Sequence, residues 1–436
     1  MKVFKFGGSC IQHPEAVKKL EQLVQSEPLR PLIVVISAMG KTTSGLEEIF
    51  QQKLNEQPYD IGIQQLYRFH RAMIDGLLCQ LQQEAYKTLT LWREKLVATL
   101  AHPTTSRTPI DKLYSEIVAE GELLASKLVY YYLREQNVAC TWLDARECIK
   151  TNKGFSNARV DWVATQYWTK TSVVPLLNKN QIMLTQGFIS SNEMGETTTL
   201  GKEGSDFTST VFASVLGAQS VTIWKDVPGI MNADPKLFKK AAKLDRISYR
   251  AVAEMAFYGA KVLHPKTVQP LEAHNIPLYV KPFHHLHEAG TEITNELSKP
   301  EYPIYILQKD QGLVHLSRGV SEFFDEACLQ EVIYQLMQYD TRTSMLEKDA
   351  YTLSICLSTD SYKLNKLLTI LSQKFKIRYH APVHLLTVIH QNAQLLQRLL
   401  YQKTALLTQK RDHIYQAVFC PDEKIATSID HMLSAH

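Results

Sequence analysis

Residues 3–9 read VFKFGGS, a short strand-like segment that two glycines interrupt. A second strand-like segment, PLIVVIS, follows at residues 31–37 and is almost continuously apolar. Runs of this kind are typical of strands buried on both faces of a parallel sheet. Residues 13–25 lie between the two segments and carry apolar side chains at helical spacing. The chain therefore begins with a strand, a glycine turn, a helix and a second strand.

Strands and helices continue to alternate as far as about residue 295. The predicted helices cover residues 46–100, 110–136, 207–216 and 251–258. The predicted strands cover residues 139–143, 182–185, 220–224 and 277–280. Residues 187–204 are rich in glycine and threonine and are predicted to form a loop. This alternation indicates a three-layer α/β domain over residues 1–295 with a mainly parallel central sheet.

The pattern changes after the polar stretch at residues 294–303, which we interpret as a linker. Strands are predicted at residues 302–317, 351–357, 385–390 and 414–419. Helices are predicted at residues 328–338, 364–374, 393–400 and 422–433. This repeated succession predicts two small α+β units, at residues 303–370 and 371–436.

The composition is that of an ordinary globular protein, with 45% hydrophobic residues, 21% charged residues and a net charge of +4. The sequence has no basic cluster typical of nucleic-acid binding and no apolar run of the ~20 residues that span a bilayer. Its start, MKVFKFGGSC, is too short and polar for a signal peptide. The seven cysteines form no CxxC pairs, which fits a reducing compartment. We therefore expect a cytoplasmic protein that binds neither nucleic acid nor membrane.

The first strand ends in a motif suited to phosphate. Lys5 lies at the carboxyl edge of the predicted sheet, where α/β folds bind ligands. Gly7 and Gly8 allow the backbone to approach a phosphate and to direct N–H groups at it. Ser9 opens the next helix, whose N-terminus favours anions. A plain turn with a surface lysine explains the motif equally well, because a glycine pair alone is weak evidence.

The second strand leads into residues 37–43, SAMGKTT, which contain the Gly-Lys-Thr of a P-loop. A P-loop also needs a glycine five positions before Gly40, where this chain has Val35, so we reject that assignment. Small and hydroxyl residues after a buried strand still suit a carboxylate or a phosphate.

Seven segments in a fixed order carry a resemblance to a known family. They are KFGGSC (5–10), VVISAMGKTT (34–43), EGELLASKL (120–128), TQGFI (185–189), TTTLGKEGSD (197–206), DVPGIMNADP (226–235) and EMAFYGAKVLHP (254–265). Together they closely resemble the aspartate kinases of the amino-acid kinase family, over nearly all of residues 1–295. An ordered set of seven motifs is far more specific than a single glycine pair.

The resemblance implies an enzyme that uses MgATP to convert L-aspartate to 4-phospho-L-aspartate, the first step of lysine, threonine and methionine biosynthesis. By similarity, the ATP-binding residues would be Lys5, Gly7, Gly8, Ser9, Lys225, Asp226, Met231, Lys236 and Lys261. The aspartate-binding residues would be Ser37, Ala38, Thr43, Glu122, Lys202 and Ser205. The catalytic residues would be Lys5, Asp206 and Lys261. The implied cofactors are ATP and Mg²⁺.

The chemistry of phosphoryl transfer agrees with these roles, because it requires mainly positioning and positive charge at the γ-phosphate oxygens. The acceptor carboxylate is already an anion, so we predict no catalytic base. Lys5 is the predicted main cation in the transition state and Lys261 a second one. Asp206 would orient the reacting phosphates or hold the metal ion.

Five positions depart from the aspartate kinase pattern. Lys202 replaces an arginine and loses the fork that matches a carboxylate, and Glu203 replaces a glycine and adds a negative charge. The other departures are Cys10 for serine, Ser44 for asparagine and Lys225 for threonine. We interpret them as weakening aspartate binding.

Two alternatives remain open at this point. Lost activity would make the chain a degenerate, non-catalytic amino-acid sensor, which the Lys202-Glu203 pair supports. Another kinase of the same fold, acting on glutamate, acetylglutamate, carbamate or a nucleotide, is disfavoured by the Glu122 motif and the C-terminal region.

The last 140 or so residues resemble a pair of ACT domains, small βαββαβ units that bind amino acids in many aspartate kinases. Residues 310–314 (DQGLV) and the helix from Cys328 carry the match to the first unit. The resemblance implies a homodimer and feedback inhibition, most simply by lysine, on family analogy alone. The length leads us to expect no appended homoserine dehydrogenase domain.

We predict no metal site built from protein side chains. His284, His285 and His287 share a loop, but no cysteine or carboxylate lies at ligand spacing. Cys10 beside Lys5 could be a reactive thiol, and we interpret it instead as a small buried residue.

Overall fold

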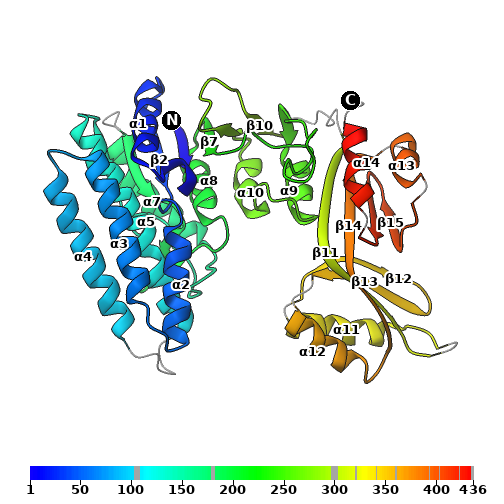
Figure 1. Ribbon diagram of the computed structural model, residues 1–436. Helices are drawn as coiled ribbons and strands as arrows, with labels where there is room; N and C mark the ends of the chain where they lie inside the picture. Colours follow the sequence, from blue (N-terminus) through cyan, green and yellow to red (C-terminus); the bar gives the residue numbers. More distant parts are fainter. Residues whose placement is uncertain are drawn as a thin grey trace. The chain divides into compact units, whose positions relative to one another are not determined.

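The computed structural model describes residues 1–102, 109–177, 182–295, 303–319, 322–339, 341–358, 361–391, 393–401, 403–421 and 423–433. The chain forms two compact units (Figure 1). The first comprises Met1–Ile230, Asp245–Ala253 and Leu263–Leu297, and the second comprises Met231–Leu244, Glu254–Val262 and Ser298–His436. The division into domains at 295, 303 and 370 stays a prediction, and residues 296–302 of the predicted linker lie outside the described residues.

The first unit contains an eight-stranded sheet in the order β3-β4-β2-β1-β7-β9-β10-β8. The strands are β1 Lys2–Phe6, β2 Leu32–Ile36, β3 Cys140–Trp142, β4 Ile182–Gln186, β7 Ser220–Lys225, β8 Arg246–Ser248, β9 Leu278–Pro282 and β10 Thr291–Thr294. Neighbouring strands from β3 to β9 are parallel, and β10 runs antiparallel to β9. The predicted mainly parallel sheet is confirmed.

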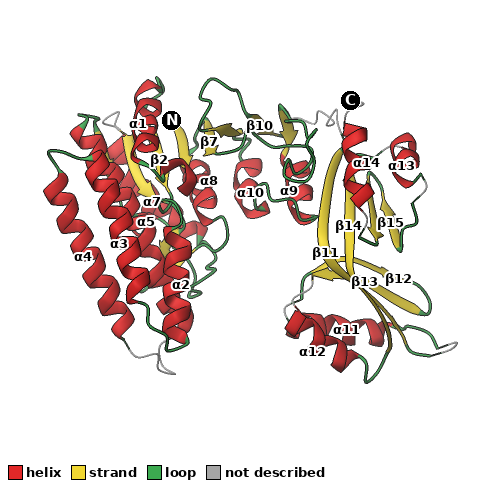
Figure 2. Ribbon diagram, in the orientation of Figure 1, coloured by secondary structure: helices red, strands yellow, loops and turns green. Residues whose placement is uncertain are grey.

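Helices cover this sheet, as the predicted α/β fold requires (Figure 2). They are η1 Gly8–Ile11, α1 Pro14–Ser26, α2 Thr42–Leu54, α3 Asp60–Leu77, α4 Gln82–Ala101, α5 Ile110–Glu135, α6 Ala145–Cys148, α7 Trp162–Leu177, α8 Gly204–Leu216 and α10 Pro265–Ala273. A further helix, α9 Tyr249–Phe257, belongs to the first unit as far as Ala253 and to the second unit from Glu254. The region predicted as helical over 46–100 is three helices, α2 to α4.

Several elements of the first unit were not predicted, among them the helices α6, α7 and α10 and the strands β8 and β10. Helix α7 was not expected, because its sequence is rich in aromatic and β-branched residues that favour strands. The loop predicted at 187–204 contains a small hairpin, β5 Ile189–Ser191 paired with β6 Thr197–Thr199. Strands of three residues are too short to produce a recognisable alternation in the sequence.

Because side chains alternate along β1, Lys5 lies on the opposite face of the sheet from its neighbours Phe4 and Phe6. Phe4 and Phe6 lie in the apolar core that the sheet shares with α1 to α5. Lys5 points to the opposite face, on which α8 packs against β1, and its side chain is buried. A buried ammonium group needs a partner of opposite charge.

The second unit is built on a six-stranded antiparallel sheet in the order β12-β13-β11-β14-β16-β15 (Figure 2). Its strands are β11 Ile304–Ser317, β12 Thr343–Lys348, β13 Thr352–Ser358, β14 Lys376–Ile389, β15 Leu407–Arg411 and β16 Ile414–Phe419. The long strands β11 and β14 pair with each other and occupy the middle of the sheet. This antiparallel region confirms the predicted α+β class, although β12 and β15 were not expected.

Four helices, α11 Glu326–Gln338, α12 Ser361–Leu371, α13 Ala393–Leu400 and α14 Glu423–Leu433, complete this unit. Helices α11 and α12 share an apolar core with β11 and β13, whereas α13 and α14 share a core with β14 and β16. The predicted first residue of the last helix, Asp422, lies outside the described residues. None of the helices that the structure describes is long and apolar enough to cross a membrane.

Candidate active site

The carboxyl ends of β1, β2, β4 and β7 meet at one edge of the sheet. The Ser37 N–H donates to the Phe6 carbonyl at 3.2 Å, and the Gly187 N–H donates to the Ile36 carbonyl at 2.8 Å. Ligands of open α/β sheets bind at this edge. A cavity of about 930 Å³ opens there.

The cavity wall contains most of the residues that the sequence pattern indicated. They are Lys5, Gly7, Gly8, Ser9, Ser37, Ala38, Thr43, Glu122, Lys202, Ser205, Asp206, Lys225 and Asp226. The remaining three, Met231, Lys236 and Lys261, belong to the second unit, so their roles at this site stay predictions.

Two lysines flank one carboxylate inside the cavity. The ammonium of Lys5 is 2.5 Å from Asp206 Oδ1, and that of Lys225 is 3.1 Å from Asp206 Oδ2. Asp206 is buried in the first turn of α8, where the helix dipole also favours a negative charge. Burial raises the pKa of Asp206, but the charges of Lys225 and Lys5 outweigh it and lower the pKa to about 2. The carboxylate is therefore ionised throughout the physiological pH range.

Gly8 allows the two loops that line the cavity to come together. The Gly40 N–H donates to the Gly8 carbonyl at 3.0 Å. A Cβ atom at Gly8 would lie 2.6 Å from the Ala38 carbonyl oxygen, which is too close for any side chain. The glycine is thus required by close backbone contact between the two loops, and its role toward phosphate stays a prediction.

Glu122 projects from α5 into the same cavity and is buried. Its Oε1 accepts a hydrogen bond from the Ala38 N–H at 3.3 Å, and its Oε2 has no hydrogen-bond partner among the described residues. Burial raises the pKa of Glu122 to about 8. The carboxyl group is therefore mostly protonated at neutral pH until a cation reaches it.

Two polar residues in the wall had no recognisable signal in the sequence. Tyr114 of α5 donates its hydroxyl hydrogen to Glu47 Oε1 of α2 at 2.8 Å, and both residues line the cavity. In the sequence, Glu47 resembles any solvent-facing residue of a helix, and Tyr114 resembles any residue that packs in a core. Only the packing of α2 against α5 brings the two together.

Two of the residues that depart from the aspartate kinase pattern, Glu203 and Lys225, carry opposite charges that act on each other. Glu203 caps the start of α8 with φ of 55°, a left-handed conformation that favours glycine, the usual residue of the aspartate kinase motif. Its Oε2 accepts a hydrogen bond from the His264 N–H at 2.5 Å. Burial lowers the pKa of Lys225, but the charges of Asp206 and Glu203 outweigh it and raise that pKa. The extra anion therefore offsets the extra cation.

Replacing Glu203 by glycine is expected to lower the KM for aspartate about fivefold. Removing one negative charge from a partly solvated cavity should strengthen the binding of an anionic substrate by about 1 kcal/mol. The left-handed strain of roughly 1–2 kcal/mol is also relieved. Steady-state kinetics measure the change. Glu203→Gln is the matched control, because it removes the charge but keeps the strain and an acceptor for His264. An unchanged KM in both variants would exclude a charge effect.

Cys10 is completely buried, and its thiol contacts the Trp224 carbonyl at 3.3 Å. Burial raises the pKa of this thiol to about 11. A protonated, inaccessible thiol is unreactive, in line with the interpretation of Cys10 as a small buried residue.

Comparison with known proteins shows the family to which this chain belongs. A family model described as the amino acid kinase family matches residues 1–282. Lysine-sensitive aspartokinase 3 of Escherichia coli is 30% identical over 366 residues, which span 82% of this chain and 78% of that protein. A bifunctional chloroplastic aspartokinase/homoserine dehydrogenase of Arabidopsis thaliana is 29% identical, and the match spans 67% of this chain but 32% of that protein.

Two solved structures of E. coli aspartokinase III resemble the whole chain. The complex with lysine and aspartate has a TM-score of 0.84 at 26% identity, covering 100% of this chain and 99% of the other. The complex with aspartate and ADP has a TM-score of 0.81 at 25% identity, with both chains fully covered. The chain belongs to the amino acid kinase family and is an aspartokinase with a C-terminal regulatory region.

Proposed function

We propose that the cavity transfers the γ-phosphoryl group of MgATP to the side-chain carboxylate of L-aspartate. The observation that carries this proposal is the Lys5–Asp206–Lys225 cluster at the carboxyl edge of the sheet, with Glu122 in the same cavity. The cluster offers cations to phosphate, and Glu122 offers a carboxylate to the substrate ammonium. One E. coli aspartokinase III structure holds aspartate with ADP, which supports the same ligand classes here.

In the proposed reaction, an oxygen of the aspartate carboxylate forms a bond to the γ-phosphorus while the bond to the β-phosphate oxygen breaks. The products are 4-phospho-L-aspartate and ADP, and no proton has to be removed from the nucleophile. Lys5 and Lys225 neutralise the charge that develops on the phosphate oxygens. Asp206 orients the two ammonium groups, because each of its oxygens already contacts one of them.

Mg²⁺ fits this cavity as an ion that the phosphates of the nucleotide bring with them. Mg²⁺ in kinases is usually held by phosphates, water and one or two carboxylates. Asp226 lines the cavity and is exposed, whereas both oxygens of Asp206 are paired with lysines. Asp226 would therefore be the carboxylate that is available to bind Mg²⁺. The ion would neutralise negative charge on the phosphates.

Binding of aspartate is expected to release close to one proton per site at pH 7. Glu122, with a pKa of about 8, is mostly protonated in the unliganded protein, and the substrate ammonium would convert it to the carboxylate. Because only the ionised form pairs well with the ammonium, affinity should rise about tenfold per pH unit up to about pH 8 and then level. Calorimetry in buffers of different ionisation enthalpy measures the proton. Glu122→Gln should bind weakly and release none; equal release in that variant would exclude Glu122 as the source.

The decisive assay is trapping of 4-phospho-L-aspartate as its hydroxamate, with MgATP and a wide range of aspartate concentrations. We expect the rate of product formation to saturate with aspartate. Lys202→Arg should have a lower KM for aspartate, since the guanidinium fork binds a carboxylate better than an ammonium does. No product at any concentration, with amino acid or nucleotide still binding, would leave the non-catalytic sensor as the function.

We further propose a homodimer that lysine inhibits through the second unit. The E. coli relative is lysine-sensitive, and one of its structures contains lysine. Helix α11 exposes Ile333, Tyr334 and Met337, an apolar face suited to a second copy. Light scattering would give the mass of the assembly, and a monomer that lysine still inhibits would contradict the dimeric site. The seven unpaired cysteines support a reducing, cytoplasmic location.

A further inference from the structure

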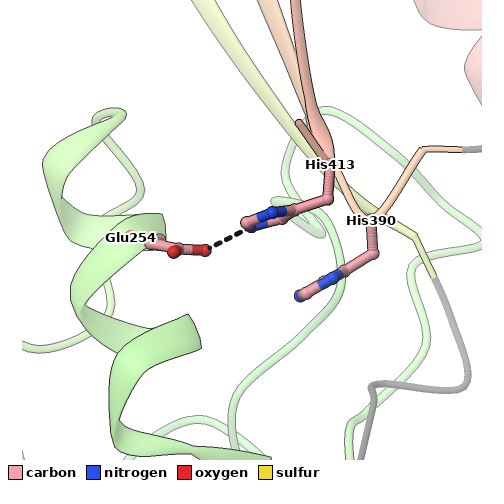
Figure 3. A group of neighbouring side chains, drawn as sticks. All are labelled: Glu254, His390 and His413. Carbon is pink, nitrogen blue, oxygen red and sulfur yellow. Dashed lines mark hydrogen bonds and ion pairs between the residues drawn. The ribbon is translucent and has the colours of Figure 1, made fainter. Parts of the chain in front are cut away.

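The second unit contains a group of three side chains that the kinase reaction does not use. Glu254 lies on α9, His390 follows the last residue of β14, and His413 precedes the first residue of β16. Figure 3 shows the two imidazole rings and the carboxylate gathered at one place. The candidate ligand atoms of the three residues all lie within 4.8 Å of one another. We propose that these residues bind a divalent transition-metal cation, with Zn²⁺ as the expected ion.

The sheet itself brings the two histidines together. Strands β14 and β16 pair antiparallel, and their last matched pair is Ile389 with Ile414. His390 and His413 occupy the next position of the same ladder, which the hydrogen bond from Gln391 N–H to the His413 carbonyl extends. Their rings stack with centroids 4.9 Å apart. The register of two strands therefore determines this pair.

The third ligand is already in place. His413 Nε2 lies 2.9 Å from Glu254 Oε2, close to the roughly 3.3 Å that separates two ligand atoms on a tetrahedral Zn²⁺. Glu254 belongs to the segment Glu254–Val262, which groups with the C-terminal region in the second unit. An ion bound here would join that segment to the ends of β14 and β16.

His390 shows two features that a ligand would explain. Its Nε2 is buried and has no hydrogen-bond partner among the described residues, an arrangement that costs stability unless something binds the nitrogen. Its φ is 58°, in the left-handed region that a residue with a side chain adopts at a cost. Unfavourable backbone conformations of this kind cluster at functional positions.

The donor atoms select the kind of ion. Two imidazole nitrogens and one carboxylate suit Zn²⁺ and neighbouring transition metals, whereas Mg²⁺ prefers oxygen donors. The Mg²⁺ that accompanies ATP should therefore not compete. Binding requires His390 to rotate about its Cβ–Cγ bond, because the lone pairs of two stacked rings lie in separate, nearly parallel planes and do not meet at one point. Water would supply a fourth ligand.

The test is equilibrium dialysis of the metal-stripped full-length protein against Zn²⁺ with excess Mg²⁺. Cys79 and Cys420 are exposed and could bind zinc themselves, so all variants carry Cys79→Ser and Cys420→Ser. We expect one tightly bound Zn²⁺ per chain. His390→Ala, His413→Ala and Glu254→Gln change direct ligands, so each should lose at least the roughly 10–100-fold in affinity that mutating an outer-shell partner typically costs. Co²⁺ bound to the parent protein should show visible absorption that these variants lack.

A matched control exists on the same sheet. His315 and His380 also have neighbouring rings, with centroids 5.9 Å apart, and the charge of Arg378 acts on His315. Among the described residues, these two histidines belong to no group of three metal-ligating side chains. His315→Ala should bind Zn²⁺ as the parent does. Zn²⁺ should raise the melting temperature of the parent, because it binds the folded state, and should raise that of His315→Ala equally. Zn²⁺ binding that survives in the double variant His390→Ala/His413→Ala, or that is lost equally in His315→Ala, would overturn the proposal.

Discussion

Replacing Lys5 by methionine is expected to lower kcat by about 10³-fold. Lys5 is buried at the cavity edge, and removing one pre-positioned cation from such a site costs about 10²–10³ in rate, with larger losses in phosphoryl transfer. Methionine keeps most of the methylene stem, so the packing between β1 and α8 should survive. The hydroxamate assay measures the rate, and thermal unfolding checks that the variant is folded.

The second lysine of the cluster provides a comparison for this prediction. Lys225 contacts the same carboxylate but from the end of β7, and the aspartate kinase pattern commonly has threonine there. Lys225→Thr should therefore lose no more than about tenfold in kcat, since one cation next to Asp206 remains. Equal losses in Lys5→Met and Lys225→Thr would show that Lys5 is not the main transition-state cation.

Asp206→Asn is the other change with a large expected effect, a loss of about 10²–10³ in kcat. Without the carboxylate, two ammonium groups would face each other in a buried site, and their mutual repulsion would lower their pKa values or displace one of them. The cations would then no longer be held in the positions that the phosphates require. The pH dependence of kcat should also change, because a lysine with a lowered pKa would lose its proton closer to neutral pH in the variant. In the native protein the Asp206 carboxylate, with a pKa of about 2, does not titrate in that range.

A double variant separates the loss of orientation from simple loss of charge. Asp206→Asn/Lys225→Thr removes one cation together with the anion, so the repulsion disappears. We expect the double variant to be more active than Asp206→Asn alone, with a clearly non-additive coupling, as residues in one ion-pair network show. Additive losses would indicate that Asp206 acts independently of Lys225.

Short local motifs were sufficient to predict most of the residues that line the cavity. Lys5, Gly8 and Ser37 lie at strand ends or in the following turns, and in a parallel sheet all such positions converge on one edge. The strands were recognisable because burial on both faces requires apolar residues throughout, as in β2. Fold class, family and most cavity residues thus followed from local patterns and their order.

Partners that are distant in the sequence could not be predicted in this way. Glu203 and Lys225 were judged separately as departures, yet the charge of one acts on the other. Tyr114 and Glu47 became a pair only through the packing of α2 on α5. Helix α7 formed despite its strand-like composition, because tertiary packing outweighs small differences in intrinsic propensity.

The clearest contrast is between Lys5 and the Glu254 group. The sequence by itself determined where the first strand ends, and therefore that Lys5, two glycines and a helix start would lie at the carboxyl edge of the sheet. Glu254 and His413 are 159 positions apart, and no periodicity or spacing connects them. Only the antiparallel register of β14 with β16, and the place of Glu254 in the same unit beside their ends, brings the three proposed ligand atoms together. Local physics determines strands and turns, whereas contacts between distant side chains depend on how the completed elements pack.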